Sequence, residues 1–74
     1  MFETIIETLA DYTSVAPEEM PRDTRLIADL DMSSLDVVDV VLAFEETYEI
    51  SIPDEDLRDL RTIGDIADYL ESRV

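Results

Sequence analysis

The chain contains no cysteine, no histidine and no lysine, and its one glycine is Gly64. Without cysteine it can form neither a disulfide nor a thiolate metal site. Without histidine or lysine it lacks the usual base for a nucleophilic serine. A single glycine leaves no glycine-rich loop to cradle a phosphate. These absences argue against an independent enzyme.

Charge is strongly one-sided: twenty acidic residues face five arginines, for a net charge of -15. Such a chain repels nucleic acid and anionic lipid, and it attracts basic protein surfaces and divalent cations. No apolar run approaches the length that spans a bilayer, and the opening MFETIIETLADY lacks the basic region of a signal peptide. We therefore expect a cytoplasmic protein with neither nucleic acid nor membrane as partner, and a monomer.

Apolar residues recur with helical spacing near the start of the chain. Phe2, Ile5, Ile6 and Leu9 fall on one helical face, which predicts a first helix ending near Thr13. The following residues 14–33 form a long connection.

Two prolines, Pro17 and Pro21, are expected to prevent a regular helix in this connection and to hold it extended. The motif LIADL predicts a short helical turn. The residues expected to anchor the connection to the core are Val15, Met20, Leu26, Ile27 and Leu30.

A second helix is predicted over SSLDVVDVVLAFEETYEI, although its β-branched run VVDVVL favours a strand by propensity. One apolar face comprises Val37, Val40, Val41, Phe44 and Tyr48. A second apolar face comprises Leu35, Val38 and Leu42, and a surface helix needs only one. The second face either packs under the long connection or contacts a partner.

Two further helices are predicted in the last third of the chain. Pro53 suits the first position of a short helix over DEDLRDL. Thr62 suits the N-cap of a last helix, with Asp65 completing a capping box. The apolar face of that last helix comprises Ile63, Ile66, Ala67 and Leu70. The prediction is one all-α domain over residues 1–74, a four-helix bundle with a short third helix and a long loop between helices 1 and 2.

The stretch LDMSSLD precedes the second helix and contains two adjacent serines. Asp29 to Ser33 begins like a calcium-binding loop, but Ser34 replaces its glycine and Val40 its final glutamate, so no metal site is predicted. Ser33 is explained as an N-cap, with Asp36 as its capping-box partner. Ser34 is not explained by capping. Its predicted place at the positive end of the helix dipole favours a phosphate-linked group.

The chain resembles the acyl carrier proteins of bacterial fatty-acid synthesis over nearly its whole length, through LIADLDMSSLDVVDVVLAFEETYEISIPDEDL and TIGDIADYL. The resemblance implies that Ser34, followed by Leu35 and Asp36, receives 4′-phosphopantetheine from coenzyme A. The family motif L-G-A-D-S-L has glycine where this chain has Asp31, and aspartate where it has Ser33. These departures are compatible with a specialised carrier.

The resemblance also implies partners and a cargo. A phosphopantetheinyl transferase and fatty-acid or polyketide synthase enzymes would meet the second helix through their basic patches. The implied partner-binding residues are Leu35, Asp36, Val38, Asp39, Leu42, Glu45, Glu46, Asp54, Glu55 and Asp56. The implied acyl-chain pocket comprises Val37, Val40, Phe44, Ile52 and Ile63.

The resemblance implies a carrier of acyl thioesters, which partner enzymes act on, rather than an enzyme. Two other functions stay open. One is a carrier for a polyketide, peptide or other specialised pathway, with the same serine and a different cargo. The other is an acidic protein-interaction module without a cofactor, which would not need Ser34.

Overall fold

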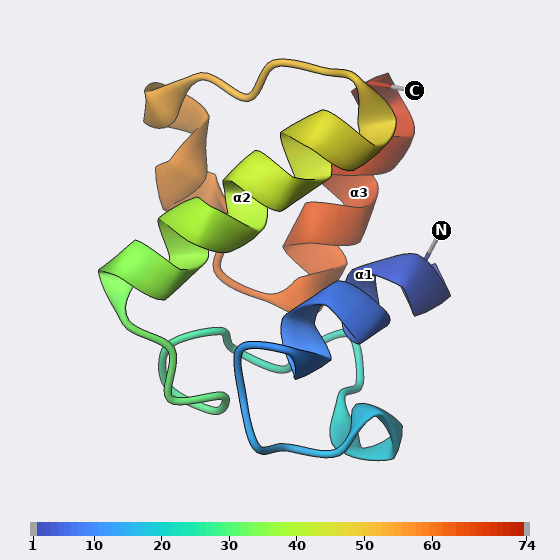
Figure 1. Ribbon diagram of the computed structural model, residues 1–74, viewed down its shortest axis with the longest axis vertical. Coiled ribbons are helices and arrows are strands. Elements are labelled where there is room, and N and C mark those ends of the chain that lie inside the picture. The colour runs from blue at the N-terminus through green and yellow to red at the C-terminus, as the bar shows by residue number, and fades with distance from the viewer. Residues whose placement is uncertain (1, 74) are drawn as a thin grey trace.

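The computed structural model describes residues 2–73, which fold into three α-helices and two 3-10 helices (Figure 1). In chain order these are α1 (Phe2–Ala10), η1 (Pro17–Glu19), α2 (Ser34–Tyr48), η2 (Asp54–Asp59) and α3 (Ile63–Arg73). The predicted four-helix bundle with a short third helix is confirmed, and its third helix, η2, is of the 3-10 type. The described residues contain no strand, only an isolated bridge between Arg25 and Thr62.

Helix α1 buries the face that its apolar spacing predicts, with Ile5 and Leu9 fully enclosed. It ends at Ala10 rather than near Thr13. The amides of Asp11 and Tyr12 still donate to carbonyls three residues back, at 3.3 and 2.9 Å, so the chain leaves the helix through a tighter turn.

The long connection is only partly extended, because Pro17 begins the 3-10 helix η1. Proline suits that first position, where an N–H would have no acceptor in the helix. The predicted turn at LIADL is confirmed: the amides of Asp29 and Leu30 both donate to the Arg25 carbonyl, at 3.0 and 3.1 Å.

Most of the predicted anchors of the connection are confirmed. Met20, Leu26 and Leu30 are at most 3% exposed, and Val15 packs at the edge of the core. The prediction that Ile27 is an anchor is wrong: the turn directs this side chain outward and leaves it 59% exposed.

Helices α2 and α3 supply the centre of the core. Phe44 and Val40 on α2 are at most 1% exposed, as are Ile63 and Leu70 on α3. Burying each such side chain stabilises the fold by about 1.5–3 kcal/mol. The helical spacing read from the sequence therefore identified the core correctly on both helices.

Both predicted capping boxes are present. At α3 the Asp65 amide donates to the Thr62 hydroxyl at 3.1 Å, and the Thr62 amide donates to the Asp65 carboxylate at 3.1 Å. The short helix begins one residue later than predicted: Pro53 is the N-cap of η2 rather than its first helical residue. No helix in the described range is long and apolar enough to cross a membrane.

Candidate functional site

The two adjacent serines have different surroundings. Ser33 is the N-cap of α2: its hydroxyl accepts the Asp36 amide at 3.2 Å, and its own amide donates to the Asp36 carboxylate at 3.1 Å. Ser34 is the first residue of α2, it is exposed, and within residues 2–73 its hydroxyl has no hydrogen-bond partner. The capping box therefore engages the Ser33 hydroxyl and leaves that of Ser34 available for chemistry.

The start of α2 is suited to an anion linked to Ser34. The amides of Ser34 and Leu35 have no acceptor among the described residues, and they lie at the positive end of the helix dipole. Backbone N–H groups in this arrangement bind phosphate groups. The donors at this helix start fit the phosphodiester that the resemblance implies.

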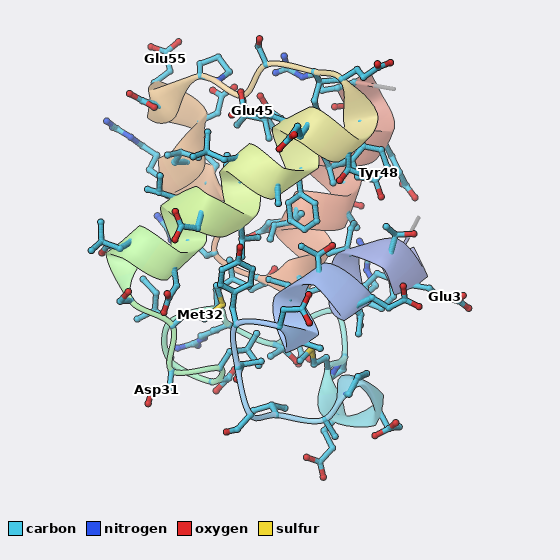
Figure 2. All side chains as sticks on the ribbon, in the orientation of Figure 1. Glu3, Asp31, Met32, Glu45, Tyr48 and Glu55 are labelled. Atoms are coloured by element: carbon cyan, nitrogen blue, oxygen red, sulfur yellow. The ribbon has the colours of Figure 1, made fainter. Side chains whose placement is uncertain are left out.

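Asp31, two residues before the cap, has left-handed backbone with φ of 56°. Figure 2 shows its carboxylate directed outward, whereas the next side chain, Met32, points toward the core and is 2% exposed. Aspartate tolerates this conformation better than most residues, and glycine adopts it freely. This explains how Asp31 can stand where the resembling motif has glycine.

An exposed apolar face runs along α2 beside Ser34. Leu35, Val38 and Leu42 are 76%, 41% and 55% exposed. Of the two possibilities left open for this face, packing under the long connection is wrong. The face is free to contact a partner.

The predicted partner-binding acids fall into two groups. Four are exposed: Asp39, Glu46, Asp54 and Glu55. The other three are half-buried and make hydrogen bonds within the fold: Asp36, Glu45 and Asp56. These internal roles of Glu45 and Asp56 do not follow from local spacing, because their partners lie seven or more residues away.

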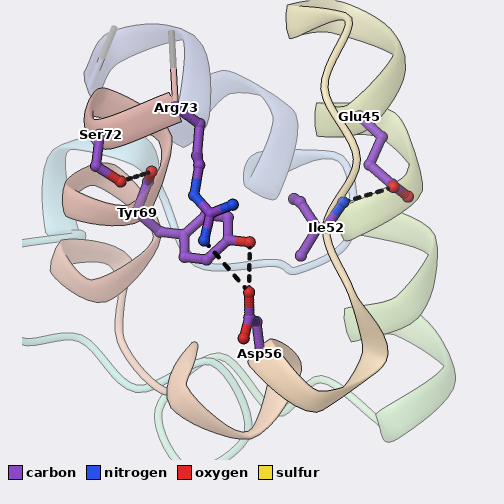
Figure 3. Close-up of polar contacts among 6 residues, drawn as sticks. All are labelled: Glu45, Ile52, Asp56, Tyr69, Ser72 and Arg73. Atoms are coloured by element: carbon purple, nitrogen blue, oxygen red, sulfur yellow. Dashed lines mark hydrogen bonds and ion pairs between the residues drawn. The ribbon is translucent and has the colours of Figure 1, made fainter.

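Glu45 and Asp56 hold η2 and the segment before it in place (Figure 3). The Glu45 carboxylate accepts the Ile52 amide at 2.8 Å. The Asp56 carboxylate accepts the Tyr69 hydroxyl at 2.7 Å and lies 3.5 Å from the Arg73 guanidinium. Partial burial and the hydrogen bond to Asp56 raise the pKa of the Tyr69 hydroxyl, while the nearby Arg73 opposes the rise.

The residues predicted to form an acyl-chain pocket do not line one open cavity. Val40, Phe44 and Ile63 are at most 1% exposed within the core, and Ile52 is 7% exposed. Only Val37 lines an open groove, of about 480 Å³, next to Ser34. A pocket formed by parting the helices around those residues stays a prediction.

The groove beside Ser34 combines apolar walls with three arginines, and we call it the arginine groove. Its lining residues are Arg25, Leu26, Ile27, Ala28, Ser34, Val37, Val38, Leu57, Arg58, Leu60 and Arg61. The three arginines were not among the predicted site residues, because they come from two segments more than thirty residues apart. Within residues 2–73 no group of three or more acidic side chains is arranged to hold a metal ion.

Comparison with known proteins connects this geometry to a family. Residues 3–70 match the family model described as "Phosphopantetheine attachment site". The chain is 39% identical over 72 residues to the acyl carrier protein of Wolinella succinogenes, covering 97% of this chain and 95% of the relative. It is 40% identical over 70 residues to that of Clostridium perfringens, covering 95% and 92%.

A solved structure shares the fold. It is described as an acyl carrier protein from Enterococcus faecalis with structural components that contribute to its high thermal stability. The TM-score is 0.88 at 22% identity, over 99% of this chain and 92% of the other.

Proposed function

Because this chain belongs to the family of acyl carrier proteins with a phosphopantetheine attachment site, we propose that Ser34 is the residue to which 4′-phosphopantetheine is attached. One observation carries the choice between the serines: the capping box engages the Ser33 hydroxyl, while the exposed Ser34 hydroxyl has no partner in the described range. The unpaired amides at the start of α2 support the same residue, since they can donate to the phosphodiester.

The function is to carry acyl groups between enzymes of fatty-acid synthesis. The chain has no cysteine, and the 4′-phosphopantetheine arm supplies the thiol that holds the acyl group as a thioester. What the chain itself contributes is an accessible hydroxyl at a capped helix start, and a charged surface for other enzymes to recognise. A specialised pathway is the second candidate, favoured by Ser33 and Asp31 in place of the aspartate and glycine of the family motif.

The exposed face of α2 is the proposed docking surface for the transferase and the synthase enzymes. Leu35, Val38 and Leu42 offer apolar contacts. The exposed acids Asp39, Glu46, Asp54 and Glu55 would meet basic patches on these partners. Such charge pairs mainly steer association and set specificity, which suits a carrier that must leave after each step. We place this exchange in the cytoplasm, with the carrier as a monomer.

The test is the intact mass of the protein after incubation with coenzyme A and a broad-specificity phosphopantetheinyl transferase. Wild type and Ser33→Ala are expected to gain one phosphopantetheine each, whereas Ser34→Ala gains none. Since Ser33→Ala removes the cap and lowers stability by about 1 kcal/mol, circular dichroism should confirm that each variant is folded. Ser33→Ala is the matched control for Ser34→Ala, because each variant removes one hydroxyl and only Ser34 is the proposed attachment residue.

A gain of mass by Ser34→Ala would contradict the assignment of the attachment residue. If no folded variant gains mass with several transferases, the carrier function itself is contradicted. The acidic interaction module would then be the better interpretation, with the exposed face of α2 as its binding surface.

A further inference from the structure

The arginine groove is the one part of the described surface where basic side chains gather. Three of the chain's five arginines, Arg25, Arg58 and Arg61, line it, and none of the described residues that line it is acidic. Twenty of the 74 residues are acidic, so this local reversal of charge is a marked departure from the rest of the chain.

These three arginines also lack carboxylate partners. The other two arginines form ion pairs, Arg22 with Asp68 at 2.8 Å and Arg73 with Asp56 at 3.5 Å. Within residues 2–73 no carboxylate oxygen lies within 4.0 Å of the guanidinium groups of Arg25, Arg58 or Arg61. Asp29 is close to Arg25, but its carboxylate accepts the backbone amide, at 2.8 Å. The groove therefore offers three guanidinium groups that the fold itself does not neutralise.

Apart from the three arginines and Ser34, every residue that lines the groove is apolar. Val37 and Val38 of α2 form one wall, and Leu57 and Leu60 in and after η2 form the opposite wall. Figure 1 shows η2 beside α2, on the side away from α1. A volume of about 480 Å³ is in the range of small-ligand pockets. The groove thus suits a ligand with a hydrocarbon body and an anionic end.

We infer that the arginine groove holds the acyl group of the loaded carrier when that group ends in a carboxylate, with its methylenes on the apolar walls and its carboxylate on the arginines. Guanidinium groups bind carboxylates through paired, charge-assisted hydrogen bonds. The net charge of -15 repels an anionic chain end from the rest of the surface, which makes the groove the favourable place for it. The inference rests on attachment of the arm at Ser34.

The phosphodiester of the arm is the other anion near the groove. It would be bonded to Ser34 itself, where the free amides of Ser34 and Leu35 are its nearest donors. Arg58 and Arg61, in contrast, belong to the opposite wall. That placement favours the far end of the cargo as the ligand of the arginines.

The experiment compares two cargoes that differ only at the far end. Octanedioyl and octanoyl groups are loaded on the chain from their coenzyme A thioesters by the transferase, and intact mass confirms each loading. The rate at which hydroxylamine cleaves the thioester reports how far the cargo is sequestered. The arginine side-chain N–H signals in a ¹H–¹⁵N spectrum report contact between the cargo and the guanidinium groups of the groove.

We expect the octanedioyl thioester to be cleaved about tenfold more slowly than the octanoyl thioester, the effect of a charge-assisted hydrogen bond on the bound population. The double variant Arg58→Gln/Arg61→Gln should reduce this ratio to near one. The matched control Arg22→Gln/Arg73→Gln changes the net charge equally outside the groove and should keep the ratio. Using the ratio between cargoes within one variant cancels any general loss of stability.

Equal cleavage rates for the two cargoes in wild type would overturn the inference. So would arginine signals that shift on attachment of the unacylated arm and then do not differ between cargoes, because the phosphodiester would then be their ligand. A chain that no transferase loads fails at the mass measurement, which overturns the proposed function and this inference together. If the chain is loaded but hydroxylamine cleaves both thioesters at the same rate, only the inference is overturned and the proposed function stands.

Discussion

Among residues 2–73, two residues other than glycine have left-handed backbone: Asp31 before α2 and Glu49 at its end, with φ of 56° and 55°. Glu49 is the C-cap of α2, and its amide donates to the Glu45 carbonyl. Helices commonly end in this conformation at a glycine, because a Cβ atom is strained there. A glutamate also places negative charge at the negative end of the helix dipole. Both effects make Glu49 unfavourable for stability.

Replacing Glu49 by glycine should therefore stabilise the fold. We expect Glu49→Gly to raise the free energy of unfolding by about 0.5–1 kcal/mol, the relief of strain less the greater chain entropy of glycine. Urea denaturation measures this change. Glu49→Gln removes the charge and keeps the Cβ atom, so it should gain less. A glycine variant no more stable than the glutamine variant would show that backbone strain at this position is unimportant.

At the scale of elements, η2 depends on its neighbours. It is a six-residue 3-10 helix without a buried residue or a side-chain cap, and 3-10 hydrogen bonds have poor geometry. Three contacts hold it and the preceding segment: Leu57 packs against the core, Tyr69 on α3 donates to Asp56, and Ile52 donates to Glu45 on α2. Since η2 contributes a wall of the arginine groove, these contacts also determine the shape of the groove.

The hydrogen bond from Tyr69 on α3 to Asp56 in η2 should make the free energy of unfolding depend on pH in the alkaline range. Partial burial and the bond to Asp56 raise the pKa of the Tyr69 hydroxyl, so the fold favours its neutral form. This contribution is fully present below the pKa of an unfolded tyrosine, about 10, and it is lost as pH rises through the higher pKa of the folded state.

The variant Tyr69→Phe tests this contact. It should lower the free energy of unfolding by about 1 kcal/mol at neutral pH, for one hydrogen bond. Above pH about 10 wild type should lose stability more steeply than the variant, so the two curves converge. Thermal melts across this range measure the effect, with Tyr12→Phe, at another half-buried tyrosine, as control. Parallel curves would contradict the role of the Tyr69 hydroxyl.

The whole molecule carries a net charge of -15 on 74 residues, and the described residues contain only two ion pairs. Mutual repulsion of the carboxylates destabilises the compact state more than the extended one. The unneutralised charge is concentrated on the acidic surface outside the arginine groove. Dissolved cations should therefore stabilise this fold by screening that surface.

We expect sodium chloride and magnesium chloride each to raise the melting temperature. A gain of about 1 kcal/mol corresponds to a rise of about 4–8 °C for a domain of this size. Comparing the two salts at equal ionic strength separates screening from binding of the divalent ion. A melting curve indifferent to added magnesium would contradict the importance of charge repulsion.

Much of this fold could be predicted from neighbouring residues alone. The apolar face of α1, both faces of α2, the turn at LIADL and the two capping boxes all depend on residues within one short segment, at most eleven positions apart. The same local logic separated Ser33 from Ser34, because a capping box involves only residues three positions apart. Helical period and capping are properties of short segments, so both can be read from the order of residues alone.

The tertiary structure decided what joins distant segments. It left Ile27 uncovered by other segments, engaged Asp56 with Tyr69, and brought Arg25 beside Arg58 and Arg61 in one groove. Each of these features depends on how separate helices and turns pack, and no short-range spacing encodes that packing. Local spacing could therefore single out Ser34 as the proposed attachment residue, whereas the arginines beside it come together only in the folded chain.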